Sequence, residues 1–289
     1  MMKMDVAPMR IKNKNMKWRN SYFAIFTLLA FVAISFQSCL DNDDDLVVGD
    51  WALVWEDNFD GDQGTLPNPN FWSFDVGTDW GNQQLEYDTD RAENASLDGE
   101  GNLAIVARRE NFAGSAFTSA RITTKGKVEQ AYGRFEARMK LPYGPGVWPA
   151  FWLLGSNIDE VGWPQCGEID MMELRGQLPG IINGSVHGPG YSGGNSITKP
   201  YTLEQDRFDN DFHIFAVEWG VDYMYFFVDD TLFMKLSPED VPGEWVYDHS
   251  FHVILNLAIG GNYVGFPTSQ TPFPQTMLVD YVRIYENRS

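Results

Sequence analysis

Hydrophobic and charged residues alternate in several segments of the chain. The clearest case is residues 134–141, which read Arg-Phe-Glu-Ala-Arg-Met-Lys-Leu. Successive side chains of a β-strand point to opposite faces, so this alternation predicts an antiparallel strand with one buried face. Further β-rich runs, separated by clusters of Gly, Pro, Asn and Asp, predict more strands. These runs cover residues 103–107, 120–123, 214–219, 223–228, 251–259 and 279–285.

The stretch from residue 51 to residue 289 reads as a single domain. It contains no repeat or linker, and no apolar pattern of helical period extends beyond a couple of turns. Many strands with few helices predict an all-β sandwich or barrel, and a sandwich of this length can form one unit. The hydrophobic content of 44% and the aromatic content of 15% supply enough apolar surface for a folded core.

The N-terminal segment has a different pattern. A group of basic residues precedes an uncharged stretch at 22–36, and small and polar residues then lead to Cys39. This order is typical of an export signal, and the stretch is short for a membrane span. It resembles a bacterial lipoprotein signal, so we expect residues 1–39 to be the signal peptide and Cys39 the lipidated residue. An ordinary secretory signal, or an uncleaved anchor with an incidental cysteine, is the alternative.

An acidic run at 41–45 follows Cys39, and we interpret residues 40–50 as a solvated tether. The run also resembles acidic surface-export signals of some Gram-negative lipoproteins. We therefore expect the protein to be exported and lipid-anchored to the bacterial outer membrane or cell surface, with the lipid as its only membrane contact. Cys166 is the only other cysteine, and we expect it to be a small buried hydrophobic residue.

The net charge of −19 excludes some classes of partner. Residues 1–39 contribute +5 to that total, with six Lys or Arg against one Asp, which leaves −24 for the rest of the chain. Such a surface repels the phosphates of nucleic acids and anionic lipid headgroups, whereas a neutral polysaccharide is indifferent to it. We therefore expect no nucleic-acid partner.

The strongest chemical feature is the apolar segment 167–173, which carries three carboxylates: Glu168, Asp170 and Glu173. In a regular strand Glu168 and Asp170 share one face, but Glu173, five residues after Glu168, points to the other. A β-bulge at Met171-Met172 absorbs one residue and restores the alternation. We therefore predict a bulged strand with all three carboxylates on one face.

Adjacent carboxylates raise one another's pKa and destabilise a fold, so a function is the best reason for the cluster. A retaining glycosidase needs one ionised carboxylate as nucleophile and one protonated carboxyl as acid, then base, roughly 5–5.5 Å apart. Side chains four strand positions apart converge only where the strand curves, which predicts a groove. A cation site is the alternative, although Ca²⁺ loops are usually rich in Gly and Asn rather than strand-like.

The segment 168–173 is similar to the signature of glycoside hydrolase family 16, in the bulged form of laminarinases and agarases. The resemblance runs from Trp55 to Tyr285. It implies an all-β fold, a β-jelly roll sandwich of two curved antiparallel sheets, with the substrate lying across a concave cleft. It also implies Glu168 as nucleophile, Glu173 as acid/base and Asp170 as their helper. Other matching segments are 80–87, which looks like that of β-1,3-glucanases, 146–152, 163–167 and 256–261.

The same resemblance implies a set of substrate-binding residues. Pyranose rings stack on aromatic side chains while polar groups bind the hydroxyls between them. For any one Trp the alternative is core filling, and a lone His is often structural. The implied residues are Trp148, Trp152 and Trp163 as sugar platforms, His187 near Glu173, and Asn82 and Arg121 as hydroxyl ligands.

Two positions depart from the family pattern. Leu174 stands where β-1,3-glucanases usually have an aromatic residue, which leaves the details of the subsites open. Asn58 stands where many relatives have an acidic ligand of a structural Ca²⁺, while Asp280 matches the family's other ligand. An amide oxygen brings no charge, so we expect a Ca²⁺ site at Asn58 and Asp280 to be weak or empty. Catalysis is expected to need no cofactor.

The sequence therefore predicts a retaining endo-acting hydrolase of β-1,3-glucan, with mixed-linked β-1,3-1,4-glucan as a second substrate, acting as a monomer. A hydrolase of an algal galactan, like agarases and carrageenases, is one alternative. Sulfated chains require basic residues, and only 21 Lys and Arg are present, six of them before Cys39. A non-catalytic surface glycan-binding protein is the other alternative, and its mark would be the loss of Glu168 or Glu173.

Overall fold

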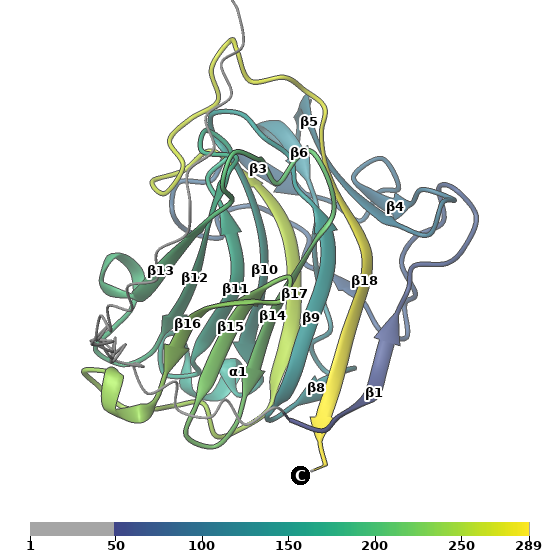
Figure 1. Ribbon diagram of the computed structural model, residues 1–289. Coiled ribbons are helices and arrows are strands. Elements are labelled where there is room, and N and C mark those ends of the chain that lie inside the picture. Colours follow the sequence, from purple (N-terminus) through teal and green to yellow (C-terminus); the bar gives the residue numbers. More distant parts are fainter. Residues whose placement is uncertain (1–48, 289) are drawn as a thin grey trace, which may run out of the picture. The chain divides into compact units, whose positions relative to one another are not determined.

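The computed structural model describes residues 49–288, which form two β-sheets stacked face to face (Figure 1). Within these residues, the sheet that we call A has ten strands and the sheet that we call B has eight. None of the helices within residues 49–288 is long and apolar enough to cross a membrane. In the part of the chain that the structure describes, helical structure is confined to α1 (Ile158–Val161) and the 3₁₀ turns η1 (Gly193–Asn195) and η2 (Pro238–Asp240).

Sheet A consists of β1 (Trp51–Asp57), β3 (Glu86–Asp88), β4 (Ala95–Leu97), β5 (Leu103–Phe112), β6 (Ser115–Ser119), β9 (Gly133–Lys140), β14 (His213–Trp219), β15 (Met224–Val228), β16 (Thr231–Leu236) and β18 (Gln275–Asn287). Its order is β16-β15-β14-β9-β18-β5-β6-β3, with β1 paired to β18 and β4 to β5. All of these pairs are antiparallel except β3 with β6.

Sheet B consists of β2 (Ser73–Phe74), β7 (Arg121–Thr123), β8 (Glu129–Gln130), β10 (Val147–Gly155), β11 (Glu168–Leu174), β12 (Ile181–His187), β13 (Ile197–Thr202) and β17 (Phe251–Ile259). Its order is β13-β12-β11-β10-β17-β7-β2, and β8 pairs with one end of β17. The strand with the three carboxylates, β11, therefore lies inside the sheet, between β10 and β12.

The predicted all-β architecture is confirmed. The alternating segment is β9 except for Leu141, which lies one residue beyond the strand. β9 pairs with β14 on one side and β18 on the other, and residues 251–259 form β17 with the predicted bounds. Two strands are longer than predicted. Residues 275–278 extend β18 because they pair with β5, and β5 runs on to Phe112 because its last residues pair with β6. Long-range pairing of this kind leaves no local signal at a strand end.

The hydrophobic core lies between the sheets. Phe135 and Phe215 reach it from sheet A, and Phe151, Ile169 and Leu255 reach it from sheet B, all fully buried. Because side chains alternate along a strand, the neighbours of these sheet B residues lie on the outer face of that sheet. Cys166 is also buried, and burial raises the pKa of its thiol to about 11, as suits a hydrophobic packing residue.

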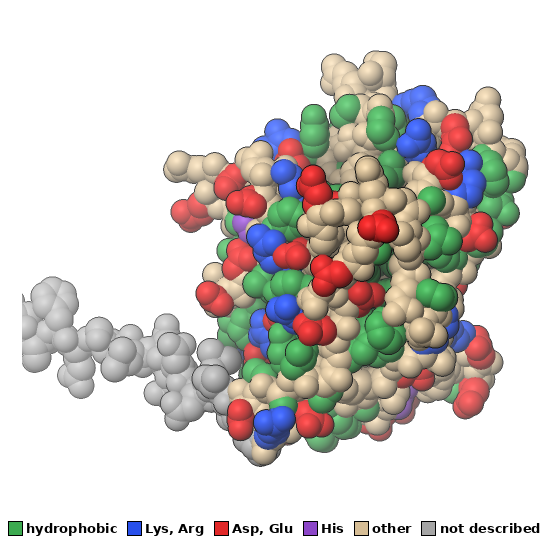
Figure 2. Space-filling view, turned by 90° about the vertical axis from the view of Figure 1, so that its right-hand side faces the viewer, with side chains coloured by type: hydrophobic (Ala, Val, Ile, Leu, Met, Phe, Trp, Pro, Cys, Tyr) green, Lys and Arg blue, Asp and Glu red, His purple; other side chains and the backbone are tan. Residues whose placement is uncertain are grey.

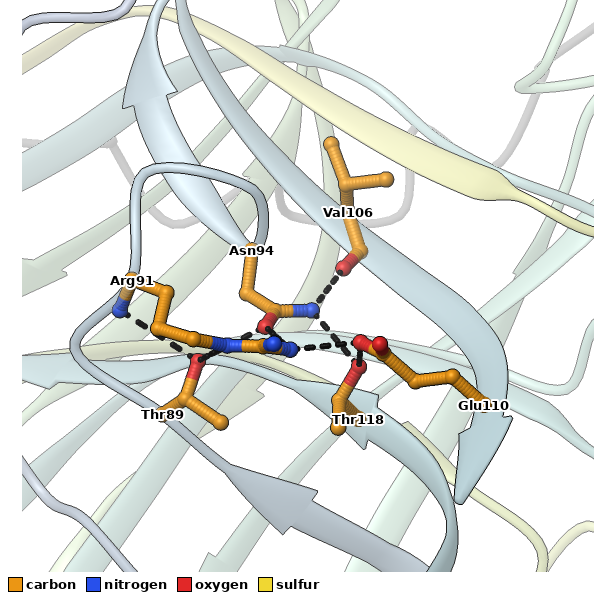
Figure 3. Close-up of polar contacts among 6 residues, drawn as sticks. All are labelled: Thr89, Arg91, Asn94, Val106, Glu110 and Thr118. Carbon is orange, nitrogen blue, oxygen red and sulfur yellow. Dashed lines mark hydrogen bonds and ion pairs between the residues drawn. The ribbon is translucent and has the colours of Figure 1, made fainter. Parts of the chain in front are cut away.

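A hydrogen-bond network holds the segment that follows β3 (Figure 3). Asn94 is fully buried, and its Oδ1 accepts hydrogen bonds from Thr89 Oγ1 (2.7 Å) and Arg91 Nη2 (2.8 Å). Its Nδ2 donates to Thr118 Oγ1 (3.0 Å) and to a backbone carbonyl of β5 (2.9 Å). Glu110 accepts from both Arg91 and Thr118. The side-chain amide of Asn94 therefore uses all its hydrogen-bonding capacity to join the segment to β5 and β6.

Acidic side chains are spread over the molecular face shown in Figure 2, where they alternate with basic and apolar groups. Surfaces of this mixed kind favour solubility and offer no extended basic patch for a polyanion on the face shown. The predicted signal peptide, Cys39 and nearly all of the tether lie outside the described residues.

Candidate active site

The register of β11 contains the predicted bulge. On the β10 side, Trp152 pairs with Asp170 and Phe151 pairs with Met172, which leaves Met171 without a partner. On the β12 side the register likewise shifts between Asp170 and Glu173. Two residues of β11 thus oppose one residue of each neighbouring strand, which is the definition of a β-bulge. The predicted bulge at Met171-Met172 is confirmed.

The bulge keeps the apolar and acidic side chains of β11 apart. Met171 and Met172 are both fully buried in the core between the sheets. Glu168 and Glu173 instead accept hydrogen bonds from indole N–H groups on the outer face of sheet B. The strand therefore fills the core from one face and carries its carboxyls on the other.

Each glutamate of the pair accepts a hydrogen bond from an indole. Trp163 Nε1 donates to Glu168 Oε2 at 3.0 Å, and Trp148 Nε1 donates to Glu173 Oε1 at 3.1 Å. Trp163 is 46% exposed, whereas Trp148 is 8% exposed. Nearly half of the Trp163 side chain is therefore open to solvent, whereas Trp148 is buried beside its glutamate. The expected roles of both as sugar platforms stay predictions. A hydrogen bond to a carboxylate favours the ionised form.

His187 lies against Asp170 and Glu168. Its Nε2 is 3.1 Å from Asp170 Oδ2 and 3.5 Å from Glu168 Oε1, while its Nδ1 accepts a hydrogen bond from the backbone N–H of Gly193 at 3.1 Å. Because Nδ1 is an acceptor, the neutral ring carries its hydrogen on Nε2, which faces the two carboxyls. The register pairs His187 with Glu168, at the other end of the strand from Glu173. Its charge acts on Glu173 as well, so His187 is near both glutamates but contacts Glu168.

Burial raises the pKa of all three acids, and repulsion by neighbouring carboxylates adds to the shift at the two glutamates. Burial raises the pKa of Glu168 and of Glu173 to about 8, and the charge of Asp170 adds to the shift in each case. Burial also raises the pKa of Asp170 well above its ordinary value. His187 opposes the shift at both glutamates. Near neutral pH the cluster therefore retains protons, as an acid catalyst requires.

A second group of aromatic side chains lies on the β7 and β2 side of the acids. The guanidinium of Arg121 lies between the rings of Trp80 and Trp152, with its Cζ 4.9 Å from each ring centroid. Its Nε donates to Asp75 Oδ2 at 3.0 Å, and Trp152 Nε1 donates to Asn256 Oδ1 at 2.8 Å. Arg121 thus fixes two indoles, and its expected role as a hydroxyl ligand stays a prediction.

Asn82, the other expected hydroxyl ligand, lies in the exposed loop that leads into β3. Its backbone is left-handed, with a φ of 53°, and its carbonyl accepts a hydrogen bond from the N–H of Asn262 at 2.7 Å. This contact joins the loop to the segment after β17. Hydroxyl binding by the Asn82 side chain stays a prediction.

Several residues of the site were not foreseen. Asp75 and Trp80 contact Arg121, Asn256 orients Trp152, and Tyr263 packs on Trp148. Asn256 opens one of the segments that resemble the family, and Trp80 opens another, so their place near the site could have been inferred. Tyr263 lies two residues beyond such a segment and has no signal of its own.

Two sets of residues bear on metal binding. Ligand atoms of Glu168, Asp170 and His187 lie within 4.8 Å of one another, which is close enough to hold a metal ion. Two of these residues are also the expected catalytic acids. The expected Ca²⁺ residues are both engaged by arginines, since Arg283 Nη2 donates to Asn58 Oδ1 at 3.2 Å and Arg138 forms an ion pair with Asp280. A guanidinium repels a cation, so these contacts do not fit Ca²⁺ held by Asn58 and Asp280.

The fold and the site together define a class of protein. A two-sheet β-sandwich that presents paired glutamates on one strand, with raised pKa values and aromatic rings beside them, is the arrangement of a two-carboxylate glycoside hydrolase.

Comparison with known proteins identifies the family. The model of glycosyl hydrolases family 16 matches residues 74–281. A β-glucanase of Rhodothermus marinus is 41% identical, over 81% of this chain and 85% of that protein, and a glucan endo-1,3-β-glucosidase of Cryptopygus antarcticus is 38% identical, over 81% and 92%. The catalytic domain of an endo-1,3-β-glucanase (laminarinase) from Thermotoga petrophila RKU-1 has a TM-score of 0.80 and 46% identity, covering 84% of this chain and 100% of that domain. The chain belongs to glycoside hydrolase family 16.

Proposed function

We propose that the protein is a retaining endo-β-1,3-glucanase that uses Glu168 as nucleophile and Glu173 as acid/base. The observation that carries this proposal is the bulged strand β11, which places both glutamates on the outer face of sheet B, each next to an indole donor. The names of the relatives support the β-1,3-glucan as substrate. The two glutamates have similar environments, so their separate roles follow from the family resemblance of the motif.

In the first step, Glu168 as a carboxylate attacks the anomeric carbon. Glu173 gives its proton to the glycosidic oxygen, which leaves with the bonding electrons, and a glycosyl ester forms on Glu168. A carboxyl with a pKa of about 8 is protonated at neutral pH and can act as this acid. Glu168 has the same raised pKa of about 8, so it must lose its proton before the attack. The Trp163 N–H and the nearby His187 favour the charged form of Glu168 that results.

In the second step, Glu173 is a carboxylate and takes a proton from water, which attacks the glycosyl ester and releases Glu168. Asp170 lies between the two glutamates in the strand and touches His187. In this proposal Asp170 and His187 adjust the charge of Glu168 as it changes between carboxylate and ester. The two displacements together retain the anomeric configuration.

A neutral glucan suits the site better than a sulfated galactan. Arg121 is already held by Asp75 and two indoles, and Arg175 stacks over the ring of Tyr263 with its Cζ 4.2 Å from the centroid. Guanidinium groups that are committed in this way are poorly placed to bind a sulfate ester. Exposed ring surface, as on Trp163, binds the apolar face of any glucose unit.

Reducing-sugar release from a panel of purified polysaccharides tests the substrate class. Laminarin should be degraded to short oligosaccharides, and mixed-linked β-1,3-1,4-glucan should be cut as a second substrate. Turnover of agarose or carrageenan without turnover of any β-glucan would overturn the proposal. Binding to laminarin without the release of reducing ends would point to a non-catalytic glycan-binding protein.

Azide rescue tests the two roles. Glu168→Ala and Glu173→Ala should both lose most activity on laminarin. With an activated aryl glycoside, azide should give an α-glycosyl azide with Glu168→Ala, because it attacks directly with inversion. It should give a β-glycosyl azide with Glu173→Ala, because it replaces water in the second step. If the two variants gave the opposite anomers, Glu173 would be the nucleophile and Glu168 the acid/base.

We further propose that the enzyme is exported and lipid-anchored through Cys39, on the strength of the signal-like sequence before that residue. The wild-type protein expressed in a bacterial host should incorporate labelled fatty acid and partition into detergent, because a lipid chain supplies the membrane affinity. Cys39→Ala should do neither. Labelling that persists in Cys39→Ala would rule out this anchor.

A further inference from the structure

Tyr263 lies in a loop that three parts of the molecule hold in place. The loop follows β17, and the N–H of Gly260 at its start donates to the carbonyl of Gly146 at 2.7 Å. The N–H of Asn262 donates to the loop before β3, as described above. Gln177 Nε2 donates to the carbonyl of Val264 at 3.0 Å. Tyr263 is therefore carried on a backbone that is fixed on both sides of it.

The side chain of Tyr263 makes three aromatic or polar contacts. Its ring packs on the ring of Trp148, with centroids 4.9 Å apart and a 42° angle between the planes. The guanidinium of Arg175 lies over the ring at 4.2 Å. The hydroxyl accepts a hydrogen bond from Asn183 Nδ2 at 2.6 Å, which fixes the ring from the β12 side. The ring also packs against a small apolar cluster formed by Trp148, Ala258 and Val264.

The two groups that Tyr263 holds both act on Glu173. Trp148 donates its indole N–H to Glu173 Oε1, and Arg175 contributes positive charge nearby. Both lower the pKa of Glu173, against burial and the charge of Asp170, which raise it. The other titratable groups around Glu173 are Glu168 on β11 and His187 on β12, and neither touches Tyr263.

We propose that Tyr263 is a positioning residue for the general acid/base. It holds the indole N–H of Trp148 and the guanidinium of Arg175 where they stabilise the carboxylate that Glu173 becomes when it protonates the leaving oxygen. The proposal rests on the proposed role of Glu173. It concerns only the proton transfer: the Glu173 O–H bond breaks, the proton bonds to the glycosidic oxygen, and that oxygen takes the electrons of the C–O bond.

A comparison of leaving groups tests this role. A β-1,3-linked gluco-oligosaccharide leaves as an alcohol and needs the proton, whereas the dinitrophenolate of 2,4-dinitrophenyl β-laminaribioside leaves without it. With Tyr263→Leu, which keeps an apolar side chain but removes the π face, kcat/KM should fall on the order of 10- to 100-fold for the oligosaccharide. For the aryl glycoside, kcat/KM should fall less than about 3-fold, since it reports only the steps up to ester formation.

Two further readouts follow from the same step. With Tyr263→Leu, kcat for the aryl glycoside should fall because the second step needs Glu173 as base, and azide should restore it. The basic limb of the kcat/KM profile for the oligosaccharide should move to higher pH. The reason is that losing the groups that favour the carboxylate raises the pKa of the acid.

Control variants separate positioning from general damage. Tyr263→Phe keeps the ring and should recover most of the difference between the two substrates. Tyr225→Leu removes a ring that stacks on Tyr223 in sheet A and should affect both substrates alike. If Tyr263→Leu does not fold, Trp148→Phe, which keeps a ring but lacks the N–H, should give the same leaving-group pattern.

Each outcome decides between the proposals. An equal loss on both substrates in Tyr263→Leu and Trp148→Phe would overturn the positioning role and point to substrate binding. A wild-type enzyme that cuts neither substrate would instead refute the β-1,3-glucanase function itself. The leaving-group comparison would then be made with aryl glycosides of whichever β-linked sugar the polysaccharide panel identifies.

Discussion

Deleting one residue of β11 should be tolerated at one position and not at another. Met171 is the residue without a partner on β10, so its deletion restores one-to-one pairing with both neighbouring strands. Glu168, Asp170 and the second glutamate would then stand at i, i+2 and i+4, still on one face. Deleting Ile169 instead places the two first acids on adjacent positions, which point to opposite faces, and turns a carboxylate toward the core.

The structure gives the size of each effect. Met171 is fully buried, and the loss of a buried Met side chain costs about 2–5 kcal/mol. For a domain of this size, each kcal/mol lowers Tm by roughly 2–4 °C, so the deletion should lower Tm by about 4–20 °C. Deleting Ile169 removes an equally buried side chain and adds several kcal/mol for an unpaired buried charge. The sum is comparable with the whole stability of about 5–15 kcal/mol of a typical domain.

Thermal melting by circular dichroism and laminarin hydrolysis should be measured on both deletions side by side. The Met171 deletion should fold and keep some activity. The activity should be reduced on the order of 100-fold, because removing the bulge moves the Glu173 carboxyl relative to Glu168 and the substrate. The Ile169 deletion should fail to fold or have no activity. Equal damage in both would refute the argument that the methionine pair is a tolerated insertion in a regular strand.

Three more predictions follow from single contacts. Trp163→Phe should lower kcat/KM on laminarin about 10-fold, because Glu168 loses its indole donor while an aromatic ring remains. An unchanged kcat/KM would show that the hydrogen bond from Trp163 does not contribute to catalysis. Because the pKa of Glu168 is raised on folding, the folded state is most stable when Glu168 is protonated. The contribution of Glu168 to the free energy of unfolding is fully present below the unfolded pKa of 4.5 and is lost as the pH rises toward about 8. Glu168→Gln should therefore melt above the wild type at pH 8, with a smaller difference at pH 4, and the reverse order would contradict the shift. Asn94→Ala should cost about 2–4 kcal/mol in urea melts without changing KM, since it leaves buried partners unsatisfied; a neutral result would mean that water replaces the amide.

Local sequence patterns predicted eight of the eighteen strands in residues 49–288, because each of these was marked by alternation or by flanking turn residues. The bulge could also be predicted, since three acids with spacings of two and three can share a face only if one residue is absorbed. Residues such as Arg121 and Trp152 could be assigned to the site by resemblance. Their mutual arrangement could not be predicted, because Arg121 of β7 contacts Trp152 of β10 and Trp80 of the loop before β3, which are far apart in the sequence.

The position of His187 shows the same limit. The family resemblance implies a place near Glu173. Antiparallel pairing puts the last residue of β12 opposite the first residue of β11, so His187 contacts Glu168 and acts on Glu173 through its charge. The surroundings of Asn58 and Asp280 show a related limit. No local signal in the sequence shows that Arg283 and Arg138 reach these two residues.

The half-exposed Trp163 should make the intrinsic fluorescence of the enzyme sensitive to the state of Glu168. Its indole N–H bonds to Glu168, and its ring lies 5.9 Å from that of His187. When Glu168 becomes a glycosyl ester, the indole loses an anionic partner and gains a sugar ring beside it. Its emission should therefore change in the stopped-flow time course at the rate of ester formation and recover at the rate of hydrolysis. Single-turnover fluorescence would then resolve the two displacements without a chromogenic substrate.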